Sequence, residues 1–423
     1  MSQPLSMKWQ LPMDISVACT LMFASLPLSL TLDMRVYGIP IHNAFYLLNI
    51  VVIALTYLTH QPVRKGTVIV YTAAGLYLAA LGLLRRDDPL FDIRSALQDV
   101  TNYAALPLGI ALAQLKGKAG LKQLLRICYL LVAIVFAVNL VLISFGYLES
   151  TGTGERQLDL AMFTSDIFIC MSFPCVWVSS GPIQKLTAVS GMILCAVFAV
   201  TSATRSMFII FIASLVLTAI VEIKKDGRYL IWISAVIILM TVGAAGGLPG
   251  LGTFQNTLLA ERLESTDYQR EDRYEELSMM LSQMGTTEWI FGSGFGRQFE
   301  SRIPESGLTA APHIGVTALL YKGGLPAFVL LIAGPCLLSS FKLLTRRRST
   351  SDPFLAGAAI YLLESCVSGG WAFIALFLLG AFLKLGWEKQ VRPIGHRIAL
   401  TSTPTLSPLA RKSREPRAIG NAS

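Results

Sequence analysis

Long apolar runs constrain the fold of this chain more than any other feature of its sequence. A helix that spans a bilayer needs about 20 mostly apolar residues. Runs of roughly this length lie near 15–32, 41–59, 66–84, 96–115, 123–145, 160–180, 186–202, 205–222, 229–246, 313–341, 354–369 and 371–387. They predict an all-α polytopic membrane protein with about twelve transmembrane helices. Because only Gly369 and Gly370 separate the last two runs, eleven helices is the alternative count.

Composition points to the same class of protein. Hydrophobic residues make up 53% of the chain and charged residues only 14%, whereas soluble domains usually carry about 25% charged residues. The net charge of +9 fits Lys and Arg on cytoplasmic loops, and no aromatic-basic motif indicates a nucleic-acid partner. The seven cysteines form no CxxC pair and lie near no histidine cluster. The sequence therefore predicts neither a disulfide framework nor a metal site, and it indicates no cofactor.

The distribution of Lys and Arg between alternate loops predicts the orientation. With the N-terminus inside, the inner loops contain Arg64, Lys65, Lys116, Lys118, Lys122, Arg126, Lys185, Lys224, Lys225, Arg228, Lys342, Arg346, Arg347 and Arg348. The short outer loops contain Arg35, Arg85, Arg86, Arg94, Arg156 and Arg205. Because cytoplasmic loops carry the excess of these residues, we expect both termini to be cytoplasmic.

The chain divides into a transmembrane domain over residues 1–387 and a tail over 388–423. The tail is basic and rich in Pro and Ser, which predicts a disordered cytoplasmic segment near anionic lipids. The domain includes one long outer loop, 247–312, between helices nine and ten. Its pattern predicts a polar helix near 265–284. A Gly-rich segment at 292–296 predicts a tight turn or an anion-binding backbone nest.

Arg205 is the strongest candidate for a functional side chain. It lies in the very short turn 201–206 at the predicted outer surface, where an ionisable group is costly unless it is paired or functional. Every basic residue in the predicted outer loops is an Arg, and a guanidinium group binds phosphate oxygens in a bidentate way. In the long loop, Arg270 and Arg273 share one face of the polar helix with Leu277.

His313 is the histidine best placed for catalysis. Preceded by Pro312, it begins a predicted helix at the outer surface, where the helix dipole favours the neutral imidazole. A neutral imidazole can accept a proton from a hydroxyl group. Four ionisable residues fall inside predicted helices, and the sequence assigns no partner to them; they are Asp99, Asp166, Lys322 and Glu364.

Three segments together resemble the Wzy/WaaL superfamily of bacterial polysaccharide polymerases and O-antigen ligases. The first is a Thr/Ser-rich turn with Arg205 at the head of a helix. The second is Arg273 followed by an aromatic-Gly-x-Gly segment at 290–296. The third is His313, which opens a helix that continues Leu-Leu-x-x-Gly-Gly-Leu at 319–325. Their order and spacing, with the long outer loop between them, carry the resemblance.

The resemblance implies a GT-C-like, metal-independent glycosyltransferase at the periplasmic face of the bacterial inner membrane. Its donor would be a glycan on undecaprenyl pyrophosphate, and transfer would invert the anomeric centre. Arg205 and Arg273 would bind the pyrophosphate, and His313 would be the base or the group that orients the acceptor. We add Arg270 to the pyrophosphate site because it lies one turn before Arg273, independently of the resemblance. We expect Arg205, Arg273 and His313 within about 10–12 Å of each other, because one pyrophosphate-sugar must bridge them. The implied partners are this donor, a glycan acceptor, membrane lipids, a flippase and a chain-length regulator.

Two acceptors fit the resemblance. A polymerase passes the glycan to a sugar hydroxyl of another lipid-linked repeat unit, in O-antigen or exopolysaccharide biosynthesis, whereas a ligase passes it to lipid A-core. The family often has Ser before the Arg and Asn after the His, but this chain has Thr204 and Ile314. The missing Asn favours the polymerase. Outside the family, a twelve-helix transporter or flippase fits the helix count, although the two halves show no repeat. A non-catalytic assembly scaffold is the third alternative.

Overall fold

The structure is a computed structural model, and its described residues cover most of the helical part of the chain. They are 16–21, 23, 35–36, 39–60, 65–144, 154–178, 181–201, 205–224, 268–301, 307–309, 315–346, 349–367 and 372–388. Within these ranges, the structure describes only the backbone of 35–36, 39–44, 60, 143–144, 154–163, 200–201, 205 and 268–274.

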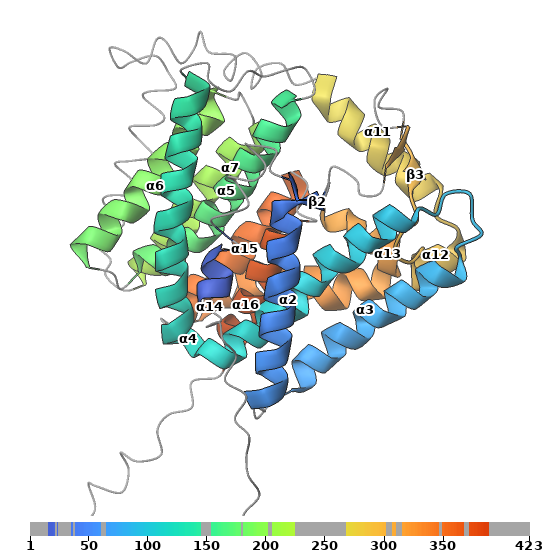
Figure 1. Cartoon of the computed structure of the whole chain (residues 1–423), viewed down its shortest axis with the longest axis horizontal. Helices are drawn as coiled ribbons and strands as arrows, with labels where there is room; N and C mark the ends of the chain where they lie inside the picture. The colour runs from blue at the N-terminus through green and yellow to red at the C-terminus, as the bar shows by residue number, and fades with distance from the viewer. Residues whose placement is uncertain are drawn as a thin grey trace, which may run out of the picture. The chain divides into compact units, whose positions relative to one another are not determined.

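Helices dominate this part of the chain (Figure 1). They are α2 (Ile41–His60), α3 (Gly66–Leu84), α4 (Ile93–Ser144), α5 (Gly154–Trp177), α6 (Pro182–Thr201), α7 (Arg205–Ile223), α11 (Tyr268–Ser282), α12 (Thr286–Phe291), α13 (Val316–Phe328), α14 (Gly334–Thr345), α15 (Asp352–Val367) and α16 (Phe373–Trp387). A π-helical stretch, η1 (Val329–Ala333), connects α13 to α14. α11 confirms the polar helix predicted near 265–284.

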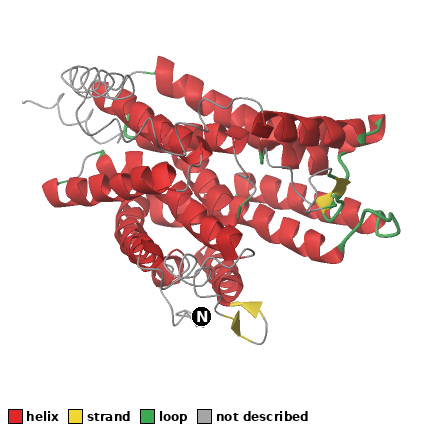
Figure 2. Cartoon of the chain, turned by 90° about the horizontal axis from the view of Figure 1, so that it is seen from above, coloured by secondary structure: helices red, strands yellow, loops and turns green. Residues whose placement is uncertain are grey.

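The strands that the structure describes form two small antiparallel hairpins (Figure 2). In the first, β1 (Arg35–Val36) pairs with β2 (Ile39–Pro40), so that Val36 lies opposite Ile39. In the second, β3 (Phe299–Glu300) pairs with β4 (Leu308–Thr309), so that Phe299 lies opposite Thr309. Neither hairpin contributes a layer to the core, and the second one belongs to the predicted long loop.

Several described helices have the length and composition of membrane spans. Five are long and apolar enough to cross a bilayer, namely Gly66–Leu84, Ile93–Leu142, Pro182–Ala199, Ser206–Ile223 and Val316–Thr345. Shorter apolar helices cover Phe45–Thr59, Thr164–Trp177 and Phe373–Trp387. The chain is therefore an all-α polytopic membrane protein, as predicted. The total of twelve helices stays a prediction, because the expected span 229–246 and most of 15–32 lie outside the described residues.

The predicted spans 96–115 and 123–145 form the single long helix α4, which bends at Gly117. This residue has φ 63° and ψ −176°, a conformation that glycine adopts without a steric penalty. The Lys side chains on either side of the bend hold it in place. Lys116 Nζ donates to Ser16 Oγ at 2.7 Å, and Lys118 Nζ donates to Ser351 Oγ at 2.9 Å. The bend thus separates two spans with almost no connecting loop.

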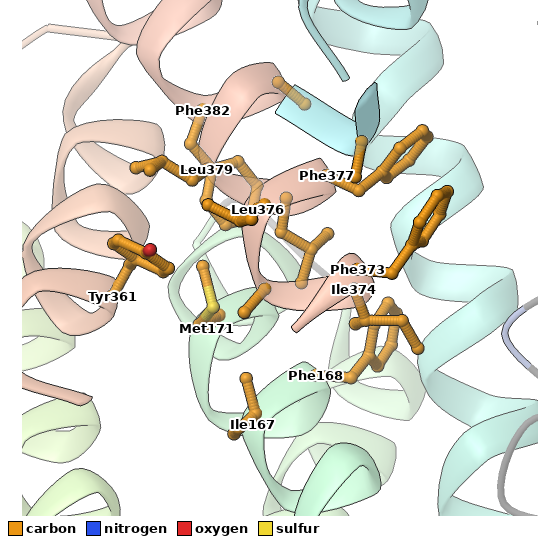
Figure 3. Close-up of a cluster of buried hydrophobic side chains, with 14 of the residues drawn as sticks. Ile167, Phe168, Met171, Tyr361, Phe373, Ile374, Leu376, Phe377, Leu379 and Phe382 are labelled. Atoms are coloured by element: carbon orange, nitrogen blue, oxygen red, sulfur yellow. The ribbon is translucent and has the colours of Figure 1, made fainter. Parts of the chain in front are cut away.

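The core centres on α16, which packs along α4 and α15. Nearly all side chains of α16 are buried, as expected of a helix that is apolar on every face. Figure 3 shows Phe373 and Ile374 of α16 beside Phe168 of α5. The backbones of α16 and α4 approach closely because Gly380 faces the carbonyl oxygen of Leu106, where a Cβ atom would overlap.

Large apolar side chains cover the outward faces of several other helices. Exposed examples are Ile69, Leu76 and Leu84 of α3, Ile183 and Leu186 of α6, and Leu337, Phe341 and Leu344 of α14. So many large exposed apolar side chains are unusual on a soluble monomer and mark contact with a membrane or a partner. Together with the apolar helix lengths, they indicate that these faces contact lipid.

The chain contacts divide the molecule into one unit over Met1–Trp387 and a second over Glu388–Ser423. The structure describes only Glu388 of the second unit. The disorder predicted for this tail lies outside the described residues and stays a prediction.

Candidate functional site

Six charged side chains, here called the charged collar, join the α3–α4 turn to α12 and α13. They are Arg85 and Asp88 of that turn, Asp99 of α4, Glu288 of α12, Arg297 between α12 and β3, and Lys322 of α13. Figure 1 shows α12 and α13 beside α3. The collar therefore connects the second half of the predicted long loop to three apolar helices.

The Gly-rich segment at 292–296 passes between α3 and α13 in close contact with both. Gly294 has φ 81°, and a Cβ atom there would overlap the backbone of Gly82 in α3. The amide N–H of Ser293 donates to Tyr321 O, and that of Gly294 donates to Lys322 O, both at 2.9 Å. Glycine is required here for two reasons, since its φ is positive and the backbones touch.

All five backbone amides of this segment already have acceptors within the protein. Besides the two bonds to α13, Gly292 N donates to Glu288 O, Phe295 N donates to Leu78 O, and Gly296 N donates to a carboxylate oxygen of Asp99. An anion-binding nest needs free N–H groups that converge on the ligand. The tight turn is therefore the correct interpretation of the Gly-rich segment, and the nest is wrong for this conformation.

Lys322 and Asp99 form a buried ion pair beneath this turn. Lys322 Nζ lies 2.9 Å from Asp99 Oδ2, and both side chains are almost completely buried. Lys322 also donates to the carbonyl oxygen of Arg297, while Asp99 accepts the Gly296 amide at 2.9 Å. A charge in a membrane span is costly unless it is paired, and here each charge has a second polar partner. The pair fixes the segment before β3 to α4 and α13.

The other four charged side chains of the collar form a continuous series of ion pairs. Glu288 Oε1 accepts hydrogen bonds from Arg85 and Arg297, each at 3.0 Å. Arg297 Nε lies 3.3 Å from Asp88 Oδ2. Burial tends to raise the pKa of Glu288, but the Arg297 hydrogen bond and the charges of both arginines outweigh it and hold that pKa below its ordinary value. Glu288 is therefore ionised at neutral pH.

Hydrogen bonds on the α4 side complete this region. Asp92 Oδ2 accepts both the amide and the hydroxyl of Ser95 at 2.8 Å, which caps the first turn of α4. The Ser95 amide bond is the main cause of a lowered pKa at Asp92. Gln298 donates to Ser95 Oγ at 2.8 Å, and Tyr321 donates to Gln298 O at 2.9 Å. The loop segment is thus bound to the helix ends by side chains as well as by backbone.

The chemistry available to the collar follows from its charge balance. Three cationic side chains face three carboxylates, so the cluster has no net charge to offer a phosphate group. Arg85 and Arg297 both donate to Glu288, which leaves them poorly suited to bidentate phosphate binding. The collar is therefore a positioning structure, and the phosphate-binding role predicted for outer arginines does not fall on these two.

α11 is held against the same region by its C-terminal half. Met280 and Met284 are buried in a small cluster with Phe299 of β3 and Tyr321 of α13. Phe299 and Tyr321 meet edge to face, with ring centroids 5.6 Å apart. The helix that carries two of the predicted site residues therefore packs on β3, and its Met280 shares a hydrophobic cluster with Tyr321 of α13.

The predicted site residues fall at or beyond the limit of the described side chains. Arg205 is the first residue of α7, and Arg270 and Arg273 lie in the first two turns of α11. Their side chains are not among those described, and His313 lies outside the described residues. Their convergence on one site, within about 10–12 Å, stays a prediction.

Sequence reasoning missed the collar for two different reasons. Lys322 and Asp99 each stood out as charges within apolar runs, but their pairing joins residues far apart in the chain. Glu288 gave no signal, since one carboxylate in an acidic loop is unremarkable by composition. The sequence feature that could have pointed to this region was the Gly-rich segment, because closely spaced glycines predict a close backbone contact.

Comparison with known proteins identifies the segment that contains the predicted motifs. The family model described as O-antigen ligase matches residues 190–332. This match confirms the resemblance to the Wzy/WaaL superfamily. No curated protein matches the chain.

The fold and the family domain together define the class of protein. The chain is a polytopic membrane protein whose residues 190–332 match the O-antigen ligase family model. That family indicates glycosyltransferase activity of the O-antigen ligase or polymerase type, with lipid-linked glycans as substrates.

Proposed function

We propose that this protein is a polysaccharide polymerase. It transfers a glycan from undecaprenyl pyrophosphate to a sugar hydroxyl of another lipid-linked repeat unit, at the periplasmic face of the inner membrane. The observation that carries the proposal is the family match over 190–332, which encloses Arg205, Arg273 and His313. The membrane-spanning fold fits a lipid-linked donor.

In this proposal, Arg205 and Arg273 bind the pyrophosphate and stabilise its developing charge, and Arg270 assists from the preceding turn of α11. Fixed guanidinium groups suit this task, since they stay charged and bind two phosphate oxygens at once. The collar supports the assignment indirectly, because Arg85 and Arg297 donate to Glu288. The spacing of Arg273 from Leu277 and Met280 also corresponds to one face of a helix.

His313 acts as the base in this mechanism. Its imidazole accepts the proton of the attacking hydroxyl, whose oxygen bonds to the anomeric carbon. The bond from that carbon to the pyrophosphate oxygen breaks, and undecaprenyl pyrophosphate leaves. One displacement inverts the anomeric centre, and the arginines supply the electrostatic stabilisation without a metal ion. A positioned base contributes about 10²–10⁴-fold to such a step.

An O-antigen ligase is the second candidate, and the description of the matching family favours it. A ligase would use the same donor and the same residues but transfer the glycan to lipid A-core. Ile314, which stands where the superfamily often has Asn after the His, favours the polymerase. A flippase and a chain-length regulator are the proposed partners of a polymerase, and both chain termini are proposed to be cytoplasmic.

The acceptor can be determined with the purified protein. An undecaprenyl-pyrophosphate-linked oligosaccharide is incubated either alone or with lipid A-core, and the products are separated by size. We expect lipid-linked products of two or more repeat units from the donor alone. Transfer to lipid A-core only would make the protein a ligase. Failure of both reactions, together with ion-coupled uptake of a solute, would replace the enzyme with a transporter.

A scaffold without catalytic activity makes a different prediction. If the protein only assembled other components, cells carrying Arg205→Ala and His313→Ala together would still make polymer. We expect polymer synthesis to stop in these cells while the variant protein remains in the membrane.

A further inference from the structure

Three side chains with metal-binding chemistry meet in the core between α5 and α6. Asp166 and Cys170 lie four residues apart on α5, which places them on one face of the helix. Cys195 of α6 faces them. One ligand atom from each residue can be chosen so that all three lie within 4.8 Å of one another, and all three side chains are completely buried.

The carboxylate of Asp166 lacks a partner that could balance its charge. Neither of its oxygens has a hydrogen-bond partner of normal geometry in the described part of the chain, and the polar group facing it is the Cys195 thiol. A buried carboxylate without a cation or hydrogen-bond donors is strongly destabilising. An unpartnered, fully buried carboxylate aimed at two thiols is therefore an incomplete arrangement that a cation would complete.

The surroundings keep the three ligands in place without adding another charge. The Tyr129 hydroxyl of α4 lies near the group but donates to the carbonyl oxygen of Ala188 at 2.9 Å. Ser214 of α7 donates to the carbonyl oxygen of Cys170 at 2.8 Å. These two hydroxyl groups orient the backbone of α5 and α6 around the site, and the sulfur and oxygen ligands remain available to a metal.

We propose that Asp166, Cys170 and Cys195 bind a borderline-soft divalent cation of the Zn²⁺ class. Two sulfur ligands and one carboxylate oxygen form a set that zinc accepts, with bonds of about 2.0–2.3 Å. Such bonds place the ligand atoms roughly 3.5–3.8 Å apart, which the three side chains reach by small rotations. Binding displaces the two thiol protons, so one Zn²⁺ exchanges for two H⁺, and the Asp166 carboxylate gains a direct bond to the cation.

The position of the site gives the metal a structural role. Cys195 precedes the end of α6 at Thr201 by six residues, which is roughly 9 Å along a helix at about 1.5 Å per residue. A bound cation would join α5 to α6 near the C-terminal end of α6. The inference rests on the described side chains alone and does not depend on the proposed enzymatic function.

The test uses the full chain, purified without a polyhistidine tag, stripped with a chelator and titrated with Co²⁺ as a spectroscopic substitute for Zn²⁺. We expect one equivalent of Co²⁺ to produce a thiolate-to-cobalt charge-transfer band, which Zn²⁺ then abolishes. Cys195→Ser should weaken binding by at least about tenfold and reduce the band. Asp166→Asn should weaken binding while the band persists.

Cys175→Ser is the matched control, since Cys175 is also buried on α5 but lies outside the group. It should bind Co²⁺ like the parent protein. If Cys195→Ser folds poorly, thermal melting of the parent protein and of Cys170→Ala decides the question, because Zn²⁺ should raise the melting temperature of the parent only. A missing band, an equal band in Cys195→Ser, or a Cys170–Cys195 disulfide in the purified protein would overturn the proposal.

Discussion

Two buried polar groups in this protein solve the same electrostatic problem in opposite ways. In the charged collar, Asp99 lies 2.9 Å from Lys322 and also accepts an amide hydrogen bond. In the core between α5 and α6, Asp166 has two thiols as neighbours and no cation within reach among the described residues. Both carboxylates are fully or almost fully buried. The first group is therefore complete within the chain, whereas the second needs a proton or a metal ion.

This difference distinguishes charged side chains that hold the fold together from charged side chains that can bind a ligand. A closed, neutral network binds elements together and has nothing left for a substrate. A group without its counter-charge is a candidate binding site. The same distinction applies to arginines, because Arg85 and Arg297 are engaged by Glu288. It removes Arg85 and Arg297 from the candidates for pyrophosphate binding, a role that the proposed function gives to Arg205 and Arg273.

The largest expected effect comes from Lys322→Met, which leaves Asp99 buried without a cation and so makes the collar resemble the second group. We expect a loss of about 3–5 kcal/mol in the free energy of unfolding, measured in detergent by thermal or denaturant unfolding. The double variant Lys322→Met with Asp99→Asn should be less destabilised than Lys322→Met alone. Equal destabilisation of both variants would show that the ion pair itself contributes little.

The second largest effect is expected for a substitution at the backbone contact between Gly294 and Gly82, on which the collar depends. Gly294→Ala forces a side chain into a positive φ and against the backbone of Gly82. We expect destabilisation by about 2–4 kcal/mol, from strain of about 1–2 kcal/mol in the left-handed region and from the displacement of α3. Gly307→Ala is the matched control, since its φ is also positive but nothing lies within 4 Å. Similar losses in both variants would contradict the close packing.

A smaller effect is expected for Glu288→Gln, which breaks the half-buried part of the collar. The loss at neutral pH should be about 1 kcal/mol. Because the folded-state pKa of Glu288 is lowered, its contribution is present above the unfolded value of about 4.3 and disappears as pH falls through the folded value. The stability difference between parent and variant should therefore shrink below about pH 4. A constant difference down to that pH would argue against the ion pairs.

The smallest effect is expected for Asp166→Asn in metal-free protein. Since this carboxylate has no cationic partner among the described residues, and a buried charge without a partner is destabilising, replacing it with a neutral amide should not lower the unfolding free energy. Asp99→Asn, measured alongside, should be clearly destabilising because Lys322 loses its counter-charge. A large loss at Asp166 would mean that an unseen partner already balances it, and the contrast between the two groups would disappear.

The fold could be predicted from the sequence wherever local composition decides the structure. The apolar runs within the described ranges, the polar helix now seen as α11 and the tight turn at 292–296 each depend on a short segment, and the described residues confirm them. The runs at 229–246 and over most of 15–32 stay predictions. Between the spans 96–115 and 123–145 the sequence predicts a loop, because spacing alone does not reveal that a single bend at Gly117 can connect the two helices.

The candidate site was less predictable, because its contacts depend on residues far apart in the chain. Asp166 and Cys195 lie on different helices, and a thiol in an apolar run looks like any other small hydrophobic side chain. Charge type alone likewise gave Arg85 and Arg205 the same phosphate-binding potential. The ion pair with Glu288 is what removes Arg85 from the candidates for phosphate binding.

Donor turnover by Arg205→Lys tests the proposed function most directly. Lysine keeps the charge but lacks the bidentate fork. With Arg86→Lys at an exposed position as the control, we expect consumption of the undecaprenyl-pyrophosphate-linked donor to fall about 10²–10³-fold in Arg205→Lys. Membrane insertion and melting temperature should not change, and Arg86→Lys should match the parent protein. Parent-like turnover in Arg205→Lys would contradict the account.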